Sequence, residues 1–535
     1  MHFDNETLDT ALETVCTRFR DTPALLIDGR TITFTDLLAH SRDCAERLRG
    51  IGIRKNDRVA ILLSNSAEYL YLYFACFTIG AWAVPISTRW ERDELRNVLI
   101  DASVKAIVFE PKIGTINYEA ILRDIRRELP TCSHFVGTTA SDITTLLFEE
   151  LFVPADPGDR SDDRHEAVSP DDVALLAYTS GTTGTPKGVM IPHRSLVLTS
   201  RHTGVLWDLG PGEVAFSVAP LYAAQGFLAV LIDLVTGVTM KWNTSFNPQD
   251  IIREFSRGGI TCFHTQPTMW SLLLAQPAFN FVDFSNLKKV IVSGSLCTHE
   301  LARRIEERVG CTVLNAYGLI EATGVVTVTR PGDSEEIRLG SVGYPIPGAE
   351  YRIVDEKRND VAPGETGELA VRGYLMKGYY NRPEKTAEVI DADGWLYTGD
   401  LATRGSDDGA VRIVGRCKDM IIRGGFNVYP VDIEECILRN ECVDDVAVVG
   451  KPDDLLGESI SAFVIPKPGV LLTEGDIKRF CRGKIANYKI PDDVHIVSQL
   501  PILISGKVQK NVLREWVCNG IPEENLVLFG SPTPF

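Results

Sequence analysis

The stretch YTSGTTGTPKGVM, from Tyr178 to Met190, contains four Thr, one Ser, three Gly and one Lys between two apolar runs. Small side chains let backbone N–H groups approach an anion closely, hydroxyls add donors, and Lys187 adds a positive charge. The apolar run before it, Asp172 to Tyr178, suits a buried strand, so the loop is expected to leave the edge of a sheet. The composition predicts a phosphate-binding loop made by Thr179, Ser180, Gly181, Thr182, Thr183, Gly184 and Lys187.

The order of residues in this loop differs from that of the common P-loop. The Walker pattern requires G-x-x-x-x-G-K followed by Ser or Thr, whereas Lys187 follows Pro186 and precedes Gly188. A mobile linker rich in Ser, Thr and Gly is the alternative, and the Lys and Pro at the end of the loop disfavour it. The loop therefore indicates nucleotide binding by another class of phosphate-handling protein.

Several further motifs carry a resemblance to a known family. YGLIE ends at Glu321, LYTGD ends at Asp400, GRCKD begins at Gly415, and SGK ends at Lys507. With the loop, these motifs follow the order found in the adenylate-forming superfamily, which the chain resembles from about Pro23 to about Trp516. That superfamily comprises acyl-CoA synthetases, adenylation domains of peptide synthetases and luciferases, and the chain is most similar to the acyl-CoA synthetases.

Composition and charge exclude several classes of protein. The chain has 535 residues, of which 44% are hydrophobic and 24% charged, so it can form several hydrophobic cores. Its net charge of −17 disfavours nucleic acid or an anionic membrane as partner. The twelve Cys form no C-x-x-C pair, and MHFDNETLD at the start lacks the apolar core of a signal peptide. We therefore expect a cytoplasmic protein with reduced thiols.

The run from Tyr69 to Ile86 has no charged residue and approaches the length of a membrane span. Gly80 and Pro85 divide it, which predicts a buried helix of about ten residues followed by a short strand. A membrane span is the disfavoured alternative.

Alternating strand-like and helix-like segments predict an α/β fold with layers of parallel sheet. Thr33, with Asp36 three residues later, is a plausible cap for the helix that follows, and ITCFHTQPTMW, from Ile260 to Trp270, has the composition of a strand. Short strands punctuated by Gly predict a β-rich subdomain at about 340–416. We predict an N-terminal adenylation domain of two sheet layers at 1–416 and a small mobile α+β domain at 417–535.

The resemblance assigns roles to three charged residues. Lys507 would bridge the acid and the α-phosphate, Lys187 would bind phosphate, and Glu321 would coordinate Mg²⁺, which suits a hard carboxylate oxygen. Without the family, Lys507 would be read as a surface lysine and Glu321 as an acid at a helix start. The family pattern around Glu321 is Y-G-x-T-E, and Ile320 stands in place of the Thr. That departure removes one phosphate contact.

The nucleotide is expected at strand ends, where open α/β sheets bind ligands. Tyr317 offers a face for adenine, and Gly318 lets the ring approach. By resemblance Asp400 would accept from the ribose hydroxyls and Arg416 would add a second ribose contact. The predicted set is completed by Gly294, Ser295 and Ala316.

The resemblance also implies a domain rotation. Lys418 falls at the family's hinge, and Gly424 and Gly425 fall in the glycine-rich loop that faces the arm of the thiol substrate. Without the family, Lys418 would be a solvated charge.

The acid pocket is expected around PLYAAQGF, from Pro220 to Phe227. Family members commonly have a His where this chain has Ala223, and the Asp that binds a substrate ammonium in amino-acid adenylation domains is absent. An apolar acid, aromatic or medium-chain, is therefore favoured over an amino acid. His264 is a candidate for the opposite wall, although a histidine on a strand is more often a satisfied core residue. The predicted pocket residues are Tyr222, Ala223, Gln225, Gly226, His264, Ser293 and Leu296.

Together these features predict an acid–thiol ligase. A carboxylic acid and Mg·ATP would give an acyl adenylate and pyrophosphate, and CoA would then take the acyl group. A free-standing ligase that loads the thiol of a carrier protein is the nearest alternative. A nucleotide-binding protein without turnover is the third, because Ile320 and Ala223 break the family pattern. The substrates would be a small acid, ATP and CoA, and a homodimer is left open.

Overall fold

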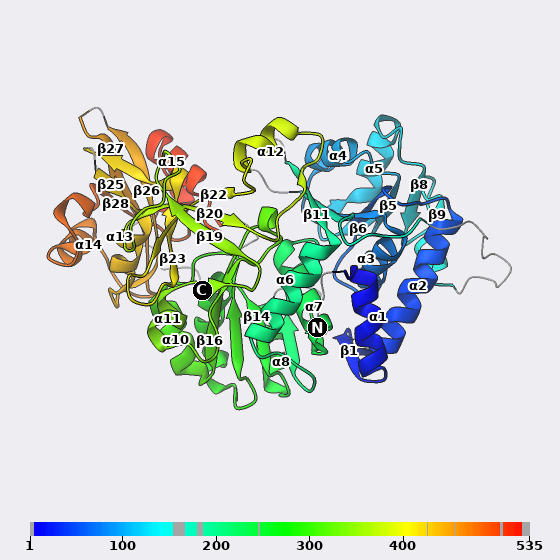
Figure 1. Cartoon of the computed structure of the whole chain (residues 1–535). Helices are drawn as coiled ribbons and strands as arrows, with labels where there is room; N and C mark the ends of the chain where they lie inside the picture. The colour runs from blue at the N-terminus through cyan, green and yellow to red at the C-terminus, as the bar shows by residue number, and fades with distance from the viewer. Residues whose placement is uncertain are drawn as a thin grey trace.

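The computed structural model describes residues 5–153, 166–178, 186–243, 247–424, 426–453, 455–502 and 507–526. Two large sheets with helices on their faces form most of the molecule, and two smaller sheets follow them in the chain (Figure 1). This arrangement confirms the predicted α/β class. The predicted loop residues Thr179, Ser180, Gly181, Thr182, Thr183 and Gly184, and Gly425 of the thiol loop, lie outside the described residues.

The first large sheet contains eight strands in the described chain and carries the predicted phosphate loop. Six of its strands are parallel, and β11 and β21 add antiparallel to one edge. The order is β21 (Gly378–Tyr379), β11 (Gly188–Pro192), β10 (Val173–Tyr178), β4 (Trp82–Pro85), β3 (Arg58–Leu62), β5 (Ala106–Phe109), β8 (His134–Gly137) and β9 (Leu146–Leu147).

The second large sheet contains nine strands in the described chain and carries the predicted nucleotide residues. The order is β18 (Tyr344–Pro345), β17 (Thr327–Val328), β16 (Thr312–Tyr317), β15 (Lys289–Val292), β14 (Cys262–Thr265), β12 (Val214–Ser217), β13 (Thr239–Trp242), β1 (Pro23–Ile27) and β2 (Arg30–Thr33). The strands from β16 to β1 in this order are parallel.

One hydrophobic cluster is shared by the two sheets, and each sheet has another on its outer face. In β3, Val59 and Ile61 belong to the shared cluster, while Ala60 and Leu62 belong to the outer one, as the period of two along a strand requires. The shared cluster includes side chains of α1 (Leu8–Phe19), α2 (Phe34–Gly50), α3 (Ala67–Ile79), α6 (His193–Leu206) and α7 (Ala224–Thr236). The other helices before β19 are α4 (Arg92–Asp101), α5 (Tyr118–Ile125), α8 (Pro248–Ser256), α9 (Pro267–Leu274), α10 (His299–Val309) and α11 (Glu335–Gly340).

Most of the uncharged run at 69–86 is part of this shared core, while Val84 and Ile86 belong to the outer cluster of the first sheet. Helix α3 is apolar on all sides and lies inside the cluster, and it ends at Gly80, whose φ of 74° is the left-handed conformation that glycine adopts without strain. Strand β4 follows, so the predicted helix and strand are confirmed. Among the described residues, no helix is long and apolar enough to span a membrane.

Local signals explain where two other elements begin. The Thr33 side chain accepts a hydrogen bond from the Asp36 N–H, and the Asp36 carboxylate accepts one from the Thr33 N–H. This capping box at the start of α2 confirms the predicted cap. The strand expected from Ile260 to Trp270 is shorter than predicted. Strand β14 ends at Thr265, and α9 begins at Pro267, because proline cannot donate to a sheet but fits the first turn of a helix.

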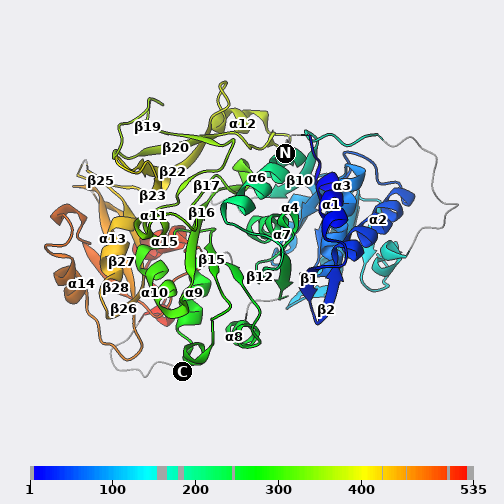
Figure 2. The ribbon, with the colours of Figure 1, turned by 60° about the horizontal axis from the view of Figure 1, so that its bottom comes forward.

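The rest of the chain forms two smaller sheets. The first is an antiparallel meander of β19 (Glu350–Val354), β20 (Gly367–Arg372), β22 (Leu396–Arg404) and β23 (Val411–Arg416), with α12 (Pro383–Val389) inserted after β20. The second, here called the C-terminal unit, contains β24 (Ile421–Arg423), β25 (Phe426–Val428), β26 (Val443–Asp453), β27 (Gly457–Pro466), β28 (Asp493–Ile496), α13 (Pro430–Leu438), α14 (Glu474–Cys481) and α15 (Lys510–Asn519). Figure 2 shows this unit beside the end of the molecule that holds α10 and α11. The domain boundary at 416–417 remains a prediction.

Candidate functional site

A cleft of about 870 Å³ lies between the ends of strands β15 and β16 and the C-terminal unit. The register of these parallel strands pairs Val292 with Asn315, so the residues after them reach the same edge of the sheet. The predicted nucleotide residues that line the cleft are Gly294, Ser295, Ala316, Tyr317, Gly318, Asp400, Arg416 and Lys507. The structure therefore brings together residues that come from one edge of the second large sheet, from the meander and from the C-terminal unit.

Gly318 is required by a close backbone approach. A Cβ at this position would lie 1.6 Å from the carbonyl oxygen of Gly324, which no side chain can tolerate. The glycine thus allows the turn after β16, which leads to Glu321, to fold tightly against the strand.

Asp400 is the centre of a polar cluster in the cleft. Tyr317 Oη donates to Asp400 Oδ2 over 2.7 Å, and Arg416 Nε lies 3.1 Å from Oδ1. An ionised carboxylate has about four acceptor positions, so both oxygens can still accept hydroxyl donors. Only 8% of Asp400 is exposed, and its two partners keep it oriented. The cluster can bind the two hydroxyls of a ribose.

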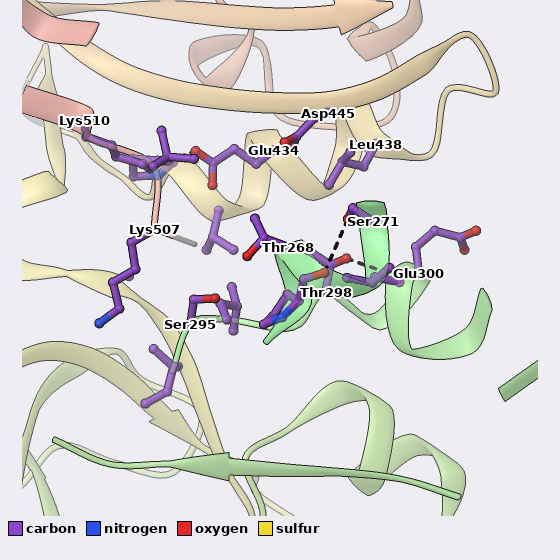
Figure 3. A pocket seen from close by; sticks show the side chains of 18 of the residues that line it. Thr268, Ser271, Ser295, Thr298, Glu300, Glu434, Leu438, Asp445, Lys507 and Lys510 are labelled. Atoms are coloured by element: carbon purple, nitrogen blue, oxygen red, sulfur yellow. Dashed lines mark hydrogen bonds and ion pairs between the residues drawn. The ribbon is translucent and has the colours of Figure 1, made fainter. Parts of the chain in front are cut away.

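Lys507 extends from the C-terminal unit into the same cleft. It precedes Val508, which forms an antiparallel bridge with Ile502. Figure 3 shows its side chain in the cleft, with Ser295 on the facing side. Burial, reinforced by the nearby Arg416, lowers the pKa of Lys507 below its ordinary value, while Asp400 opposes the shift. Lys507 stays exposed to the cleft, with Asp400 and Glu321 among the charges that act on it, and an incoming polyphosphate would add negative charge beside its ammonium group.

Glu321 and Lys187 both contact the side chain of Tyr379. Glu321 lies in the single turn η4 (Ile320–Ala322), and its Oε1 accepts a hydrogen bond of 2.9 Å from Tyr379 Oη. Lys187 Nζ lies 4.9 Å from the centre of the same ring. Ile320, the departure from the family pattern, packs against the shared hydrophobic cluster. Its side chain therefore stabilises the turn instead of supplying a donor.

The described residues on either side of the phosphate loop fix its two ends. Tyr178 pairs with Gly188 across β10 and β11, the two antiparallel strands on either side of this stretch of the chain. Tyr178 Oη also donates to Asp101 Oδ2 over 2.7 Å, and Arg382 lies 2.7 Å from Asp101 Oδ1. Tyr178 and Gly188 therefore both lie in paired strands.

The predicted acid pocket contains a network of amides. Gln225 Nε2 donates to the Thr265 carbonyl over 2.8 Å and to Ser293 Oγ over 3.0 Å, and Gln225 Oε1 accepts from Gln266 Nε2. A carbonyl oxygen only accepts, so the Thr265 contact sets the orientation of both amides in turn. The network joins the start of α7 to the ends of β14 and β15.

The neighbouring residues differ in exposure. Tyr222, Ala223 and Gln225 are partly exposed, and Leu296 lines the cleft with 39% of its surface exposed. Gly226 is buried, and a Cβ there would lie 2.1 Å from the Pro220 carbonyl oxygen. Tyr222, Ala223 and Gln225 are therefore partly accessible at the start of α7, and none of them is among the described residues that line the cleft.

His264 lies in the core. Its side chain is buried, and Nε2 lies 3.1 Å from the fully buried Asp233 of α7. This pair connects β14 to α7. His264 is therefore a core histidine with a hydrogen-bond partner, which was the alternative given in the sequence analysis. Any part in the acid pocket would be indirect and stays a prediction.

The predicted hinge and thiol residues lie in different places. Lys418, in the turn η5 (Cys417–Asp419), lines the cleft, and Arg514 of α15 lies 2.7 Å from the neighbouring Asp419. Gly424 is exposed and is absent from the described lining of the cleft, with its N–H donating to Leu456 O over 2.7 Å. Lys507 therefore occupies the cleft while Gly424 lies outside it.

Sequence reasoning missed Tyr379 and Gln266. Both stand in stretches without a recognisable motif, and each acquires a role only through partners far away in the chain. A buried tyrosine needs a partner for its hydroxyl, which is the one general signal that could have drawn attention to Tyr379.

The donor set at Glu321 fits a metal that is shared with a substrate. Among the described residues, no group of three His, Cys, Asp or Glu could hold a metal ion. A single carboxylate with an oxygen left to accept is what Mg²⁺ needs when nucleotide phosphates and water complete its coordination.

The chain matches known proteins over nearly its whole length. Residues 12–380 match the model of the AMP-binding enzyme family, and residues 432–507 match that of the AMP-binding enzyme C-terminal domain. A CoA ligase of Rhodococcus jostii (strain RHA1), named for a 7a-methyl-1,5-dioxo-octahydro-1H-inden-4-yl propanoyl group, is 36% identical over 95% of this chain and 98% of its own. The mitochondrial medium-chain acyl-CoA ligase ACSF2 of Rattus norvegicus is 33% identical over 96% of this chain and 88% of its own.

Solved structures agree with these matches. The anthranilate CoA ligase AuaEII in complex with anthranoyl-AMP superposes with a TM-score of 0.87 at 26% identity, covering 96% of this chain and 97% of that one. The protein therefore belongs to the AMP-binding enzymes of the adenylate-forming superfamily, in the branch of the acyl-CoA synthetases.

Proposed function

We propose that this protein joins a carboxylic acid to CoA in two steps driven by ATP. The observation that carries the proposal is the position of Lys507, which the C-terminal unit places in the same cleft as Tyr317, Asp400 and Arg416. A nucleotide held at Asp400 would have its phosphates within the field of that ammonium group. The protein would be an AMP-forming acid–thiol ligase.

In the first step a carboxylate oxygen attacks the α-phosphorus of ATP. The bond to the bridging oxygen of the β-phosphate breaks, and pyrophosphate leaves with that electron pair. Attack of one anion on another requires local positive charge, which Lys507 and Lys187 would supply. The product is the acyl adenylate.

Glu321 would hold Mg²⁺ through its carboxylate. When bound, the ion would neutralise charge on the phosphates and orient them for an in-line displacement. Tyr379 Oη fixes Glu321 Oε1, so the orientation of this carboxylate is set before the nucleotide arrives.

In the second step the CoA thiolate attacks the acyl carbonyl, and AMP leaves. Gly424 lies outside the cleft, so presenting it to the acyl adenylate requires the C-terminal unit to move. Lys418 is the proposed hinge, and Gly424 and Gly425 the proposed contact with the arm of CoA. The same movement would withdraw Lys507 and expose the activated carbonyl.

The proposed acid is aromatic or medium-chain and carries no α-amino group. The related enzymes are named for a fused-ring propanoate, a medium-chain acid and anthranilate. Ala223 replaces a bulkier side chain at the start of α7, and Ala223, Tyr222 and Gln225 are all partly exposed. The small side chain of Ala223 would leave more room for an apolar acid than a bulkier residue at this position.

A pyrophosphate-release assay across an acid library tests the proposal. We expect release with an aromatic or medium-chain acid, and thioester formation when CoA is added. Best turnover with an α-amino acid would contradict the proposed acid class. Thioester formed only on a holo-carrier protein would identify the carrier-loading alternative, and ATP binding without release for any acid would indicate a protein that has lost turnover.

A further inference from the structure

Tyr379 lies between two residues that are distant in the sequence and close in the site. It belongs to β21, the strand at the edge of the eight-stranded sheet, and it is 6% exposed. Its hydroxyl donates to Glu321 Oε1 over 2.9 Å, and its ring centre lies 4.9 Å from Lys187 Nζ. One side chain thus contacts both the carboxylate and the ammonium group that act on phosphates.

The backbone around Tyr379 reinforces this position. Met376 N–H donates to the Glu321 carbonyl over 2.8 Å, and Tyr380 N–H donates to the Gly188 carbonyl over 2.8 Å. Residues 376–380 therefore bond at one end to the turn that carries Glu321 and at the other end to β11, directly after Lys187. The segment acts as a brace between the two groups.

We propose that Tyr379 is a positioning residue, which presents Glu321 to the metal ion and Lys187 to the phosphates of ATP in one fixed arrangement. The inference rests on the proposed function. It goes further by assigning to this side chain the coupling between the metal-binding carboxylate and the phosphate-binding lysine.

The hydroxyl of Tyr379 would orient Glu321, and its ring would restrain Lys187. The hydroxyl occupies Oε1 of Glu321, and Oε2 has no hydrogen-bond partner among the described residues, so Oε2 is the oxygen left for the ion. Outer partners of this kind orient metal ligands and alter metal affinity strongly. The ring attracts the Lys187 ammonium through its face, which restrains a flexible side chain.

Simple packing is the competing explanation, because Tyr379 belongs to the shared hydrophobic cluster. Phenylalanine would fill the same space without a hydroxyl. Burying a hydroxyl is unfavourable unless a partner accepts a hydrogen bond from it. The acceptor here is a carboxylate of the site itself. Packing alone explains an aromatic ring at this position. The hydroxyl is explained by its hydrogen bond to Glu321, which is the positioning role proposed here.

The test separates metal-dependent from metal-independent binding of ATP. Binding is titrated calorimetrically on the full chain, once with Mg²⁺ and once with EDTA, for the wild type, Tyr379→Phe and Tyr379→Leu. We expect Tyr379→Phe to weaken ATP binding on the order of tenfold with Mg²⁺ and to leave binding in EDTA unchanged. Tyr379→Leu should weaken binding in both conditions, because Lys187 also loses its support.

Tyr380→Phe is the matched control, since it removes a hydroxyl from the next residue, whose ring packs edge-on against Trp82. It should match the wild type in both titrations. Wild-type binding by Tyr379→Phe with Mg²⁺, or equal weakening with and without Mg²⁺, would overturn the proposal. If Tyr379→Leu fails to fold, the two ATP titrations of Tyr379→Phe are sufficient to test the proposal.

The binding titration is independent of the acid. If the wild type binds ATP more tightly with Mg²⁺ but turns over no acid in the library, the proposed function fails while the role of Tyr379 is still measured. With an active acid, Tyr379→Phe should also raise the Mg²⁺ concentration needed for half-maximal adenylation and leave the KM for the acid unchanged.

Discussion

Tyr317 and Asp400 are joined by a hydrogen bond of 2.7 Å that connects two sheets, because Tyr317 ends β16 of the nine-stranded sheet and Asp400 lies in β22 of the meander. The bond fixes the carboxylate relative to the strand ends of the cleft. Both residues were expected to contact the nucleotide, and the contact between them is visible only in the folded chain.

Substitution of Asp400 should weaken ATP binding. Hydrogen bonds to a charged group contribute about 1.5–3 kcal/mol, so Asp400→Asn should raise the KM for ATP roughly ten- to a hundredfold. Tyr317→Phe removes a positioning bond and should raise it about fivefold, from a loss of about 1 kcal/mol. Pyrophosphate release at varied ATP measures both. Asp408→Asn, whose carboxylate pairs with Arg412 at 2.6 Å, is the control and should leave the KM unchanged.

Removal of the Lys507 ammonium should affect only the first step. Lys507→Ala should lower adenylation on the order of a hundredfold or more, because one preorganised charge is lost. Transfer to CoA from a separately prepared acyl adenylate should remain close to wild type. Lys510→Ala is the matched control, since Lys510 pairs with Glu434 at 2.8 Å and lines the same cleft. Equal losses in the two variants would remove Lys507 from the mechanism.

The lowered pKa of Lys507 predicts an alkaline limit of activity. Burial and Arg416 move the pKa below the ordinary lysine value of 10.5, and the protonated form is the active one. The kcat/KM for adenylation, which reports the free enzyme, should therefore be full at lower pH and fall as pH rises through the lowered pKa. Lys507→Arg keeps its charge and should move this limit upward. An identical limit in that variant would assign the titration to another group.

The amide network should influence the choice of acid. Gln225→Leu removes the donors to Thr265 and Ser293, so the ends of β14 and β15 lose their link to α7. We expect the ranking of acids in the library to change while the KM for ATP stays within about twofold of wild type, because the nucleotide cluster at Asp400 is separate. An unchanged ranking would show that these amides serve the fold alone.

His193 should make the protein less stable in mild acid. It is fully buried, its Nδ1 accepts from Leu8 N–H over 3.3 Å, and burial lowers its pKa from 6.5 to about 4. The folded state thus binds fewer protons than the unfolded state, so the stabilising contribution is present above pH 6.5 and is lost as pH falls towards 4. The free energy of unfolding should drop by about 2 kcal/mol between about pH 7 and pH 5 from this group. Urea unfolding measures the drop, and His193→Asn should reduce it.

Local patterns predicted much of the fold. The capping residues Thr33 and Asp36 are neighbours on one turn, and the end of α3 depends on Gly80 alone, so these features can be read from short stretches. The boundary after Thr265 was missed, because ITCFHTQ and PTMW both mix apolar and polar residues and only Pro267 separates a strand from a helix. Periodicity does not distinguish such short runs.

The sequence by itself determined the class of fold and, through the resemblance of its motifs, the family and the candidate residues Lys187, Glu321, Asp400 and Lys507, because each stands in a short motif that can be matched without knowing the fold. Only the tertiary structure decided that Tyr379 lies between Glu321 and Lys187, that His264 turns inward to Asp233, and that Lys507 occupies the cleft while Gly424 stays outside. The physical reason is that these contacts join elements far apart in the chain. Strand register and side-chain packing bring them together, and neither is encoded within a single segment.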